Sequence, residues 1–521
     1  MRYIEIYDTT LRDGAQAEGV SFSLHDKCCL AERLASLGFN YVEGGYPASN
    51  EKDHAFFQRM ANRQFPHTRI SAFGMTRRKN CAVAEDSGLR ALLDSNASVI
   101  TLVGKTSHFQ AVDILRVSEE ENLCMIRESV EFLVANGRDV IFDAEHFFDG
   151  WAENPEYTLR CLRAAKDAGA KTLVLCDTNG GSLPERIFDA TKSVVDALGA
   201  SVGIHCHNDC DLAVANSLAA VEAGADQVQG CINGFGERCG NANLISIIAN
   251  LALKKGYDLL LPGATTALTE LSRYVYEMVN INAPANLPYV GKSAFAHKGG
   301  MHVSAIARNS KSYEHISPSL VGNESRVLVS ELSGRSNIMA LAEKHHISND
   351  PKLLEKILAR VVSHENYGYA YEAAAGSFDL LVKKCSGTFT PHFDVLKYHI
   401  NITGRSKEGA SRIWTEAIVK IRIDDQIYYE VADGDGPVNA LDAALRKALL
   451  KKYPSLERMH LLDYKVRVIN SEAGTAAGVR VVIESRDEKD TWGTVGVSEN
   501  VVEASWIALT DSVEYKLHKD E

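Results

Sequence analysis

Two histidines, an aspartate and an asparagine are the residues of this sequence best suited to hold a metal ion. His205 and His207 end a short apolar run that reads as a strand. Side chains two positions apart on a strand point to the same face, so the two imidazoles would lie side by side while Cys206 points away. Asp13 and Asn241 could add oxygen ligands from other strands. Such a mixed nitrogen and oxygen set, with positions open for a substrate, suits Mg²⁺, Mn²⁺ or Zn²⁺.

The cysteines offer a second and weaker metal hypothesis. Cys206 and Cys210 lie near the histidines and could suggest a structural zinc site, but strand alternation turns Cys206 away from both imidazoles. The 11 cysteines are scattered, odd in number and without the spacing of a disulfide framework. This usage indicates reduced thiols in a cytoplasmic protein.

Other polar residues could bind or activate a small acid. Arg12 could hold a carbonyl or carboxylate through two hydrogen bonds, or it could form only a local salt bridge with Asp13. Thr178 offers a hydroxyl beside the glycines at 180–181, which either binds a carboxylate or belongs to a tight turn with a cap. Glu145 could polarise a reacting group or support a metal ligand. His302 lies in a glycine-rich segment, where a histidine could be structural or, on a mobile loop, serve as a general base.

The residues up to about position 260 repeat one unit, a short apolar strand followed by a polar or glycine-rich loop and an amphipathic helix. Ser23 is expected to cap a helix that ends at Gly38. Eight strands are expected, at Tyr3–Tyr7, Tyr41–Gly44, Arg69–Phe73, Val99–Val103, Val140–Asp143, Thr172–Cys176, Val202–His205 and Gln227–Ile232. Eight such units predict a (β/α)8 TIM barrel, in which reactive groups gather at the C-terminal ends of the strands. Polar residues follow those ends here, including Glu43 and Lys105, although Asp177 could be only a cap.

The whole chain is expected to be an α/β protein of three parts. Residues 1–265 would form the catalytic barrel, residues 266–388 linker subdomains that contribute His302, and residues 389–521 a C-terminal regulatory or dimerisation domain. Helical stretches are expected in the linker around Ser336–His345 and Pro351–Val362.

The C-terminal part reads as two copies of one strand-rich unit that ends in a helix, a duplicated α+β domain. Alternating runs at Ala417–Ile423 and Val479–Glu484 predict amphipathic strands. The helix positions Val438, Ala440, Ala444 and Leu445 recur at one constant offset as Val502, Ala504, Ala508 and Leu509, and Tyr428 recurs as Trp492. Because this part has no cluster of acid, base and nucleophile, a regulatory or dimerising role is favoured.

Composition excludes several classes of partner. Hydrophobic residues make up 45% and charged residues 24% of the 521 residues, which is ordinary for a soluble globular protein. The net charge of −12 argues against nucleic acid or an anionic membrane as the main partner. No signal peptide is recognised at the N-terminus, and no window reaches the ~18 apolar residues of a membrane span.

Three motifs, in this order, resemble the signatures of the α-isopropylmalate synthase and homocitrate synthase family. They are the segments at 12–16 (Arg-Asp-Gly-Ala-Gln), 205–209 (His-Cys-His-Asn-Asp) and 234–241 (Gly-Phe-Gly-Glu-Arg-Cys-Gly-Asn). The likeness continues through Phe295–His302 into the C-terminal part. The segments at 142–150, 434–441 and 497–506 are most similar to the longer type of synthase whose acceptor is pyruvate and whose product is (R)-citramalate.

The resemblance implies a Claisen-type condensation of acetyl-CoA with a 2-oxo acid, followed by thioester hydrolysis. It implies that the metal ligands are Asp13, His205, His207 and Asn241. Arg12 would stabilise oxygen charge, Thr178 would bind the acceptor carboxylate, and Glu145 would assist near the thioester. The remaining roles would be the base assembly of His302 with Tyr313 and a pocket for the acceptor side chain at Phe73, Val103 and Asp143.

The family likeness further implies a homodimer whose C-terminal domain binds an amino-acid effector, with isoleucine as feedback inhibitor. Other acceptors stay open, namely 2-oxoisovalerate, 2-oxoglutarate and oxaloacetate. A catalytically inactive amino-acid sensor and a lyase running the reverse reaction are alternatives of other kinds. The related lyases carry a reactive cysteine in a Gly-Cys-Pro loop, whereas the matching loop here reads Gly-Glu-Arg-Cys-Gly-Asn, which favours a synthase.

Overall fold

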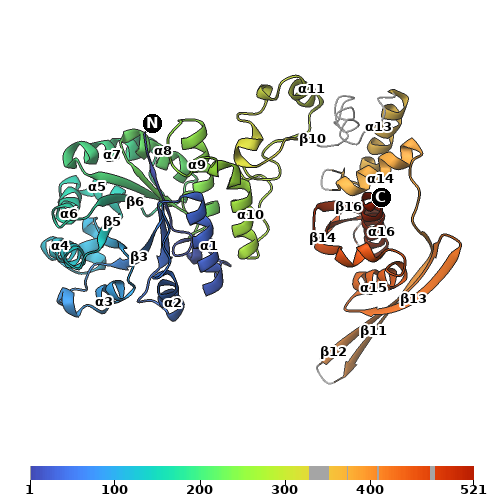
Figure 1. Ribbon diagram of the computed structural model, residues 1–521, viewed down its shortest axis with the longest axis horizontal. Helices are drawn as coiled ribbons and strands as arrows, with labels where there is room; N and C mark the ends of the chain where they lie inside the picture. Colours follow the sequence, from blue (N-terminus) through green and yellow to red (C-terminus); the bar gives the residue numbers. More distant parts are fainter. Residues whose placement is uncertain (1, 328–350, 372–373, 408–409, 470–473, 475) are drawn as a thin grey trace. The chain divides into compact units, whose positions relative to one another are not determined.

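The computed structural model describes residues 2–521, apart from 328–350, 372–373, 408–409, 470–473 and 475 (Figure 1). The chain divides into two compact units, residues 1–295 with 316–324 and residues 296–315 with 325–521. Within the described ranges, no helix combines the length and the apolar character that crossing a membrane requires.

The first unit is a closed barrel of eight parallel strands, as predicted. Its strands are β1 (Glu5–Asp8), β2 (Tyr41–Gly45), β3 (Arg69–Met75), β4 (Val99–Lys105), β5 (Asp139–Glu145), β6 (Thr172–Asp177), β7 (Ser201–Cys206) and β8 (Gln227–Gly230). Strand β8 pairs with β1, where Val228 lies opposite Ile6, and this pairing closes the sheet. All eight predicted strands are confirmed, with ends that differ by a few residues.

Helices surround the strands on the outside, as Figure 1 shows. They are α1 (Leu24–Leu37), α2 (Glu51–Met60), α3 (Ser87–Asp94), α4 (Glu119–Ala135), α5 (Phe147–Glu153), α6 (Pro155–Asp167), α7 (Pro184–Leu198), α8 (Ala213–Ala223), α9 (Leu244–Leu253) and α10 (Leu268–Met278). The predicted cap of α1 is confirmed, because Ser23 and Asp26 form a reciprocal capping box. Gly38 ends the helix with a φ of 87°, which a glycine adopts without strain.

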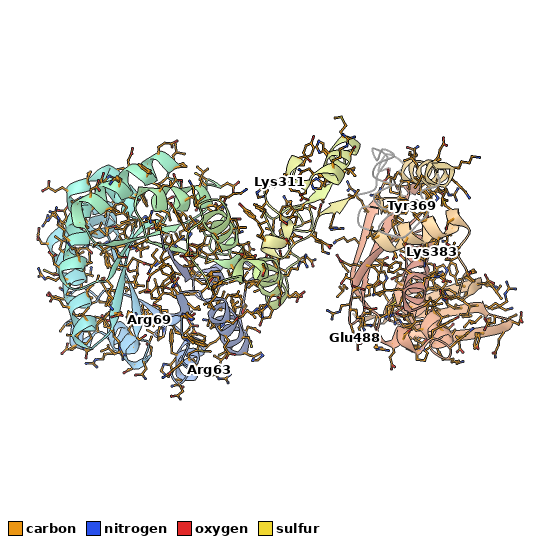
Figure 2. All side chains as sticks on the ribbon, turned by 45° about the horizontal axis from the view of Figure 1, so that its top comes forward. Arg63, Arg69, Lys311, Tyr369, Lys383 and Glu488 are labelled. Atoms are coloured by element: carbon orange, nitrogen blue, oxygen red, sulfur yellow. The ribbon has the colours of Figure 1, made fainter. Side chains whose placement is uncertain are left out.

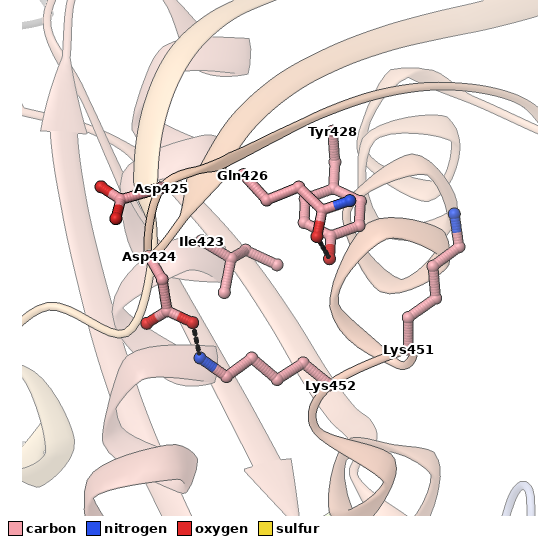
Figure 3. Close-up of a pocket in the computed structure, with 7 residues that line it drawn as sticks. All are labelled: Ile423, Asp424, Asp425, Gln426, Tyr428, Lys451 and Lys452. Carbon is pink, nitrogen blue, oxygen red and sulfur yellow. Dashed lines mark hydrogen bonds and ion pairs between the residues drawn. The ribbon is translucent and has the colours of Figure 1, made fainter.

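Both faces of the barrel strands are buried. Because side chains alternate along each strand, one apolar core lies between the strands and the helices, and a second lies inside the barrel. Outward-pointing residues such as Ile6 and Ile204 pack against the helices in one large apolar cluster. Inward-pointing residues make a small cluster inside the barrel, formed by Tyr7, Val99, Ile141, Val174 and Cys176. At the start of β3, Arg69 (labelled in Figure 2) donates to Asp139 at the start of β5, at 2.7 Å. The N-terminal end of the barrel is thus held by packing and ion pairs, which leaves the opposite end for chemistry.

The second unit begins with short elements, β9 (Ala296–His297), α11 (Gly300–Arg308) and β10 (Arg326–Val327), followed by α13 (Pro351–Asn366) and α14 (Ala375–Ser386). The predicted helix at Pro351–Val362 is confirmed by α13, while the helical stretch expected at Ser336–His345 lies outside the described residues. Tyr369, labelled in Figure 2, stacks with Tyr371, which packs on Phe378 of α14.

The duplicated α+β architecture at the C-terminal end is confirmed. Strands β11 (Asp394–Lys407), β12 (Ala410–Ile423) and β13 (Gln426–Gly434) form an antiparallel sheet followed by α15 (Pro437–Leu449). Strands β14 (His460–Val468), β15 (Val479–Arg486) and β16 (Thr491–Ser498) form a second sheet followed by α16 (Val501–Asp520). The repeated helix positions Ala440, Ala444, Ala504 and Ala508 are all fully buried against the sheets in one core.

A buried ion pair joins α1 and α2 close to the end of β2. Lys27 donates from Nζ to Asp53, and to the carbonyl oxygen of Gly44 at 3.0 Å. Burial lowers the pKa of Lys27, while Asp53 acts in the opposite direction and keeps the ammonium charged. The pair fixes the strand end that carries Glu43.

We expect Asp53→Ala to lower the free energy of unfolding by about 3–5 kcal/mol, because the mutation leaves the Lys27 ammonium buried without a counter-ion. The matched control is Asp196→Ala, which breaks the exposed pair with Lys192 on α7 and should cost less than about 1 kcal/mol. Denaturant unfolding of both variants measures the difference. Equal losses in the two variants would contradict a special role for the buried pair.

Candidate active site

The structure brings together three of the four predicted metal ligands at the C-terminal end of the barrel. The Nε2 atom of His205 lies 3.2 Å from Oδ2 of Asp13, and Nε2 of His207 lies 4.0 Å from the same oxygen. All three side chains are buried, and their ligand atoms lie within 4.8 Å of one another. Cys206 points the other way into the outer core, as strand alternation predicts, and is no member of this group.

The fourth predicted ligand, Asn241, is held beside His207 by an antiparallel bridge between the two residues. The loop before it needs glycine, because Gly240 has a φ of 91° and a Cβ there would collide with the carbonyl oxygen of Gly234. Oδ1 of Asn241 and Nδ1 of His207 are both buried, and neither finds a hydrogen-bond partner among the described residues. Buried polar atoms normally have partners, so Oδ1 of Asn241 is an atom that a bound cation would satisfy, whereas a cation beside Asp13 would meet Nε2 of His207 and not Nδ1.

A relay of side chains from other strands fixes the tautomer of His205. Nδ1 of His205 lies 2.9 Å from Oε1 of Gln229, and Nε2 of Gln229 donates to Oδ1 of Asp143 at 3.0 Å. Because the amide NH₂ of Gln229 faces the carboxyl group, its oxygen must face the imidazole, so Nδ1 of His205 carries the proton. The lone pair on Nε2 then points toward Asp13. Metal-binding histidines in proteins are oriented by partners of this kind.

The charges of the site agree with metal binding. Burial alone would raise the pKa of Asp13, but Arg12, His205 and His207 together hold it well below its usual range, so the carboxyl group is ionised. Burial, aided by the neighbouring His205, lowers the pKa of His207 to about 4 and keeps that imidazole neutral. Although burial lowers it, the neighbouring Asp13 raises the pKa of His205, so a metal ion would compete with a proton for Nε2 of this ring. The ionised carboxylate of Asp13 and the neutral imidazole of His207 are already in the forms that bind metals. The donor set therefore fits a divalent ion.

Arg12 is held rigidly at the same mouth. Its Nε donates to Oε2 of Glu43 at 2.5 Å, Nη1 lies 3.6 Å from Oδ1 of Asp13, and the guanidinium lies 3.9 Å from the centroid of the Phe73 ring. Glu43 is fully buried and also accepts from the Tyr7 hydroxyl at 2.9 Å. The two carboxylates raise the pKa of Arg12 against the effect of burial, so a fixed positive charge stands beside the metal ligands.

Thr178 and Glu145 lie at the ends of adjacent strands. The Thr178 hydroxyl accepts from the backbone N–H of His146 at 2.8 Å, which leaves its own hydrogen to donate to a ligand. Glu145 forms an ion pair with Lys105. The glycine amides do not all point to a ligand, because N–H of Gly180 closes a turn on the Asp177 carbonyl at 3.0 Å.

The carboxylate of Asp177 is bonded within its own loop, because it accepts from the hydroxyl of Ser182 at 2.9 Å and from the backbone N–H of the same residue at 3.3 Å. The helix α7 that follows has no side-chain cap. Of the two interpretations of this segment, the contacts of Asp177 and Gly180 agree with a tight turn, and ligand binding remains a prediction for Thr178.

The three residues predicted to line the acceptor pocket share the inner face of the barrel. Phe73 and Val103 lie two positions beyond Ser71 and Thr101, whose hydroxyls meet inside the barrel at 2.9 Å. Asp143 is opposite Val103 in the pairing of β4 with β5. Burial raises the pKa of Asp143 to about 7, although His205 acts to lower it.

His302 and Tyr313 belong to the second unit and lie together there. Their rings stack with centroids 4.1 Å apart and planes inclined by 24°. The glycine-rich segment is helical at His302, which stands in the first turn of α11, whereas the general-base interpretation placed it on a mobile loop. Beside them, Nε2 of His297 lies 3.4 Å from Oε1 of the buried Glu314.

Gln229 and the contacts of Glu43 are the parts of the site that motif reasoning missed. Glu43 could be recognised as a polar residue at a strand end, but nothing local shows that it binds Arg12. A signal for Gln229 does exist, because glutamines alternate with Val228 along a fully buried strand. Polar residues at alternate positions of a buried barrel strand face the interior and must bond there.

Comparison with known proteins assigns the family. Residues 3–275 match the HMGL-like family, residues 289–367 the homocitrate synthase post-HMGL domain-like family, and residues 372–517 the LeuA allosteric (dimerisation) domain. The first match covers the whole barrel. The chain therefore belongs to the HMGL-like family of barrel enzymes.

Relatives of full length narrow the assignment. The chain is 51% identical to the (R)-citramalate synthase of Aquifex aeolicus (99% of this chain, 98% of the relative) and 50% identical to that of Geobacter sulfurreducens (100% and 99%). It is 31% identical to a probable 2-isopropylmalate synthase of Methanopyrus kandleri (98% and 97%). Within the family, the chain groups with the citramalate synthases and is an acyl-CoA:2-oxo acid condensing enzyme.

We expect Gln229→Leu to weaken divalent-metal binding about 10–100-fold, because Nδ1–H of His205 loses its acceptor and the ring is no longer held in the metal-binding tautomer. Gln227→Leu is a matched control, since Gln227 lies two positions earlier on the same face of β8 and donates to Glu5 at 3.0 Å. Calorimetric titration of the full chain with Mn²⁺ measures both affinities. Unchanged affinity in Gln229→Leu would contradict the orienting role.

Proposed function

We propose that this enzyme condenses acetyl-CoA with pyruvate to give (R)-citramalate and CoA. The observation that carries the proposal is the full-length similarity to proteins named (R)-citramalate synthase, at 51% and 50% identity. The buried histidine pair with Asp13, Asn241 and Arg12 gives that similarity a chemical basis, because the reaction places negative charge on a ketone oxygen.

Asp13, His205, His207 and Asn241 would hold a divalent metal ion, Mg²⁺ or Mn²⁺ with Zn²⁺ as an alternative, which supplies Lewis acidity at the ketone oxygen of the acceptor. Arg12 donates to the same oxygen as its charge grows in the transition state. Because Glu43 and Phe73 hold the guanidinium in place, this stabilisation requires little rearrangement during the reaction.

The remaining groups bind the acceptor and move the proton. The hydroxyl of Thr178 donates to the acceptor carboxylate, and Glu145 acts near the thioester. His302, stacked on Tyr313, accepts a proton from the methyl group of acetyl-CoA. The resulting carbon nucleophile attacks the ketone carbon, the ketone oxygen takes up a proton, and water then hydrolyses the thioester to release CoA as the thiol.

Acceptor choice is assigned to Phe73, Val103 and Asp143. Bulk at these inner-face positions would suit the methyl group of pyruvate better than the isopropyl group of 2-oxoisovalerate. The alternative acceptor 2-oxoisovalerate has a specific observation behind it, the 31% identity to a probable 2-isopropylmalate synthase. A homocitrate synthase-like reaction on 2-oxoglutarate is the further alternative. Discrimination by apolar contacts is limited to about 1–3 kcal/mol per methylene.

We also propose that the enzyme is a homodimer, inhibited by isoleucine bound to the C-terminal domain. The match to the LeuA allosteric (dimerisation) domain supports the regulatory part. The first sheet of this domain exposes large side chains on the face turned away from α15, namely Trp414 (53% exposed), Ile427 (55%) and Tyr429 (63%). An exposed apolar face of this kind is typical of a surface that meets a partner, here a second copy.

All 11 cysteines are free, which supports the cytoplasm as the location.

The first test is release of CoA from acetyl-CoA with Mg²⁺ or Mn²⁺ and a panel of 2-oxo acids. We expect kcat/KM for pyruvate to exceed that for 2-oxoisovalerate by at least ~10-fold. Asp13→Asn is the control, because loss of a metal ligand should abolish release with every acceptor. Isoleucine, added next, should lower the rate with pyruvate.

Preference for 2-oxoisovalerate in this assay would overturn the acceptor while keeping the metal site and mechanism. No release with any acceptor from the metal-replete enzyme would favour an amino-acid sensor.

Dimerisation is tested by sedimentation, which should give twice the chain mass of 57.0 kDa. We expect Tyr429→Glu to shift the enzyme toward the monomer, since a charge on the exposed sheet face would be buried against its symmetry mate. Tyr367→Glu is the matched control, at a tyrosine that is 68% exposed outside the sheets of the same unit. A wild-type enzyme that sediments as a monomer would be evidence against this interface, and so would a Tyr429→Glu variant that sediments as a dimer.

A further inference from the structure

A second group of metal-binding side chains lies in the C-terminal domain. Ligand atoms of His392, His518 and Glu521 lie within 4.8 Å of one another. His392 stands two residues before β11, while His518 and Glu521 lie on the last turn of α16 and directly after it. The group therefore connects the beginning of the domain to its C-terminal helix.

A buried carboxylate orients the first of these histidines. Oε2 of Glu514 lies 2.9 Å from Nδ1 of His392, and Oε1 accepts from the backbone N–H of the same residue at 3.1 Å. Glu514 is only 7% exposed. This carboxylate places the ring proton on Nδ1, so the lone pair of His392 is on Nε2, the atom that lies 3.1 Å from Oε1 of Glu521.

A lone pair and a carboxylate oxygen at 3.1 Å repel each other unless a positive charge lies between them. A second proton on His392 or a metal ion would provide that charge, and a second imidazole at the same carboxylate favours the metal ion. Nδ1 of His518 lies 3.4 Å from Oε2 of Glu521, so both imidazoles face one carboxylate. Two imidazoles and a carboxylate form a ligand set that suits zinc.

The side chain of His518 is enclosed by the domain, and its two ring nitrogens differ in their surroundings. Its side chain is only 4% exposed, and its Nε2 is buried with no hydrogen-bond partner among the described residues. Nδ1, which faces Glu521, is the atom that His518 offers to an ion, and its ring lies against that of His392 with the two centroids 4.6 Å apart.

We propose that His392, His518 and Glu521 bind a zinc ion that is distinct from the metal of the barrel. Glu514 is the positioning residue that sets the tautomer of His392, and water completes the coordination. The ion would fasten the last turn of α16 to the segment that enters β11. It would therefore stabilise the fold of this domain and take no part in the condensation.

The test is zinc titration of the full chain carrying His205→Ala and His207→Ala, which removes the barrel site. We expect one zinc equivalent to remain, and to be lost when His518→Ala is added. His460→Ala, at an exposed histidine of β14, is the matched control and should retain the equivalent. Co²⁺ in place of zinc gives a visible spectrum that reports imidazole ligation without relying on activity.

Glu521→Gln provides a second variant that cannot disturb packing, because this side chain is 66% exposed. It should weaken zinc binding at least ~10-fold while leaving thermal unfolding in a chelator unchanged. No zinc equivalent in the barrel-site variant would overturn the proposal and assign the charge between His392 and Glu521 to a proton. Binding that survives His518→Ala would overturn it equally.

Discussion

The negative charge of Asp13, buried at the mouth of a closed barrel, is the element on which the rest of the site depends. A buried carboxylate ionises only when positive or hydrogen-bond-donating groups surround it. Arg12 supplies one such charge, and the histidine pair stands on its other side. The guanidinium of Arg12 is paired in turn with the carboxylate of Glu43, which also accepts a hydrogen bond from the hydroxyl of Tyr7. The site is therefore a series of compensated charges, and the proposed divalent ion would complete it.

This series of compensated charges is possible because side chains alternate between the two faces of each strand. Inside a barrel, side chains from neighbouring strands form layers, and a polar layer above an apolar one can be bonded from several strands at once. Asp143 of β5 reaches Gln229 of β8, which reaches His205 of β7. The three residues are far apart in sequence, and only closure of the barrel through β8 and β1 brings the strands around one interior. The tautomer of His205 is thus a consequence of topology.

Much of this architecture could be predicted from the sequence, for physical reasons. Apolar residues at alternate positions and helix caps are local signals in the sequence. The eight strands, the cap at Ser23 and the repeated C-terminal unit could therefore be predicted. The pair His205 and His207 follows from alternation alone. The contacts of Gln229 and Glu43 were not accessible, because they depend on which strands become neighbours and in which register. The helical environment of His302 was missed because its glycines resembled a loop.

The two proposed metal sites differ in the group that orients a histidine. In the barrel the partner of His205 is the neutral amide of Gln229, whereas in the C-terminal domain the partner of His392 is the carboxylate of Glu514. A carboxylate makes the imidazole a stronger donor and so reduces the charge that the metal presents to other ligands. A neutral partner leaves more Lewis acidity for a substrate oxygen. The amide therefore suits the proposed polarisation of a ketone in the barrel, and the carboxylate suits the proposed zinc ion, which would hold two segments together.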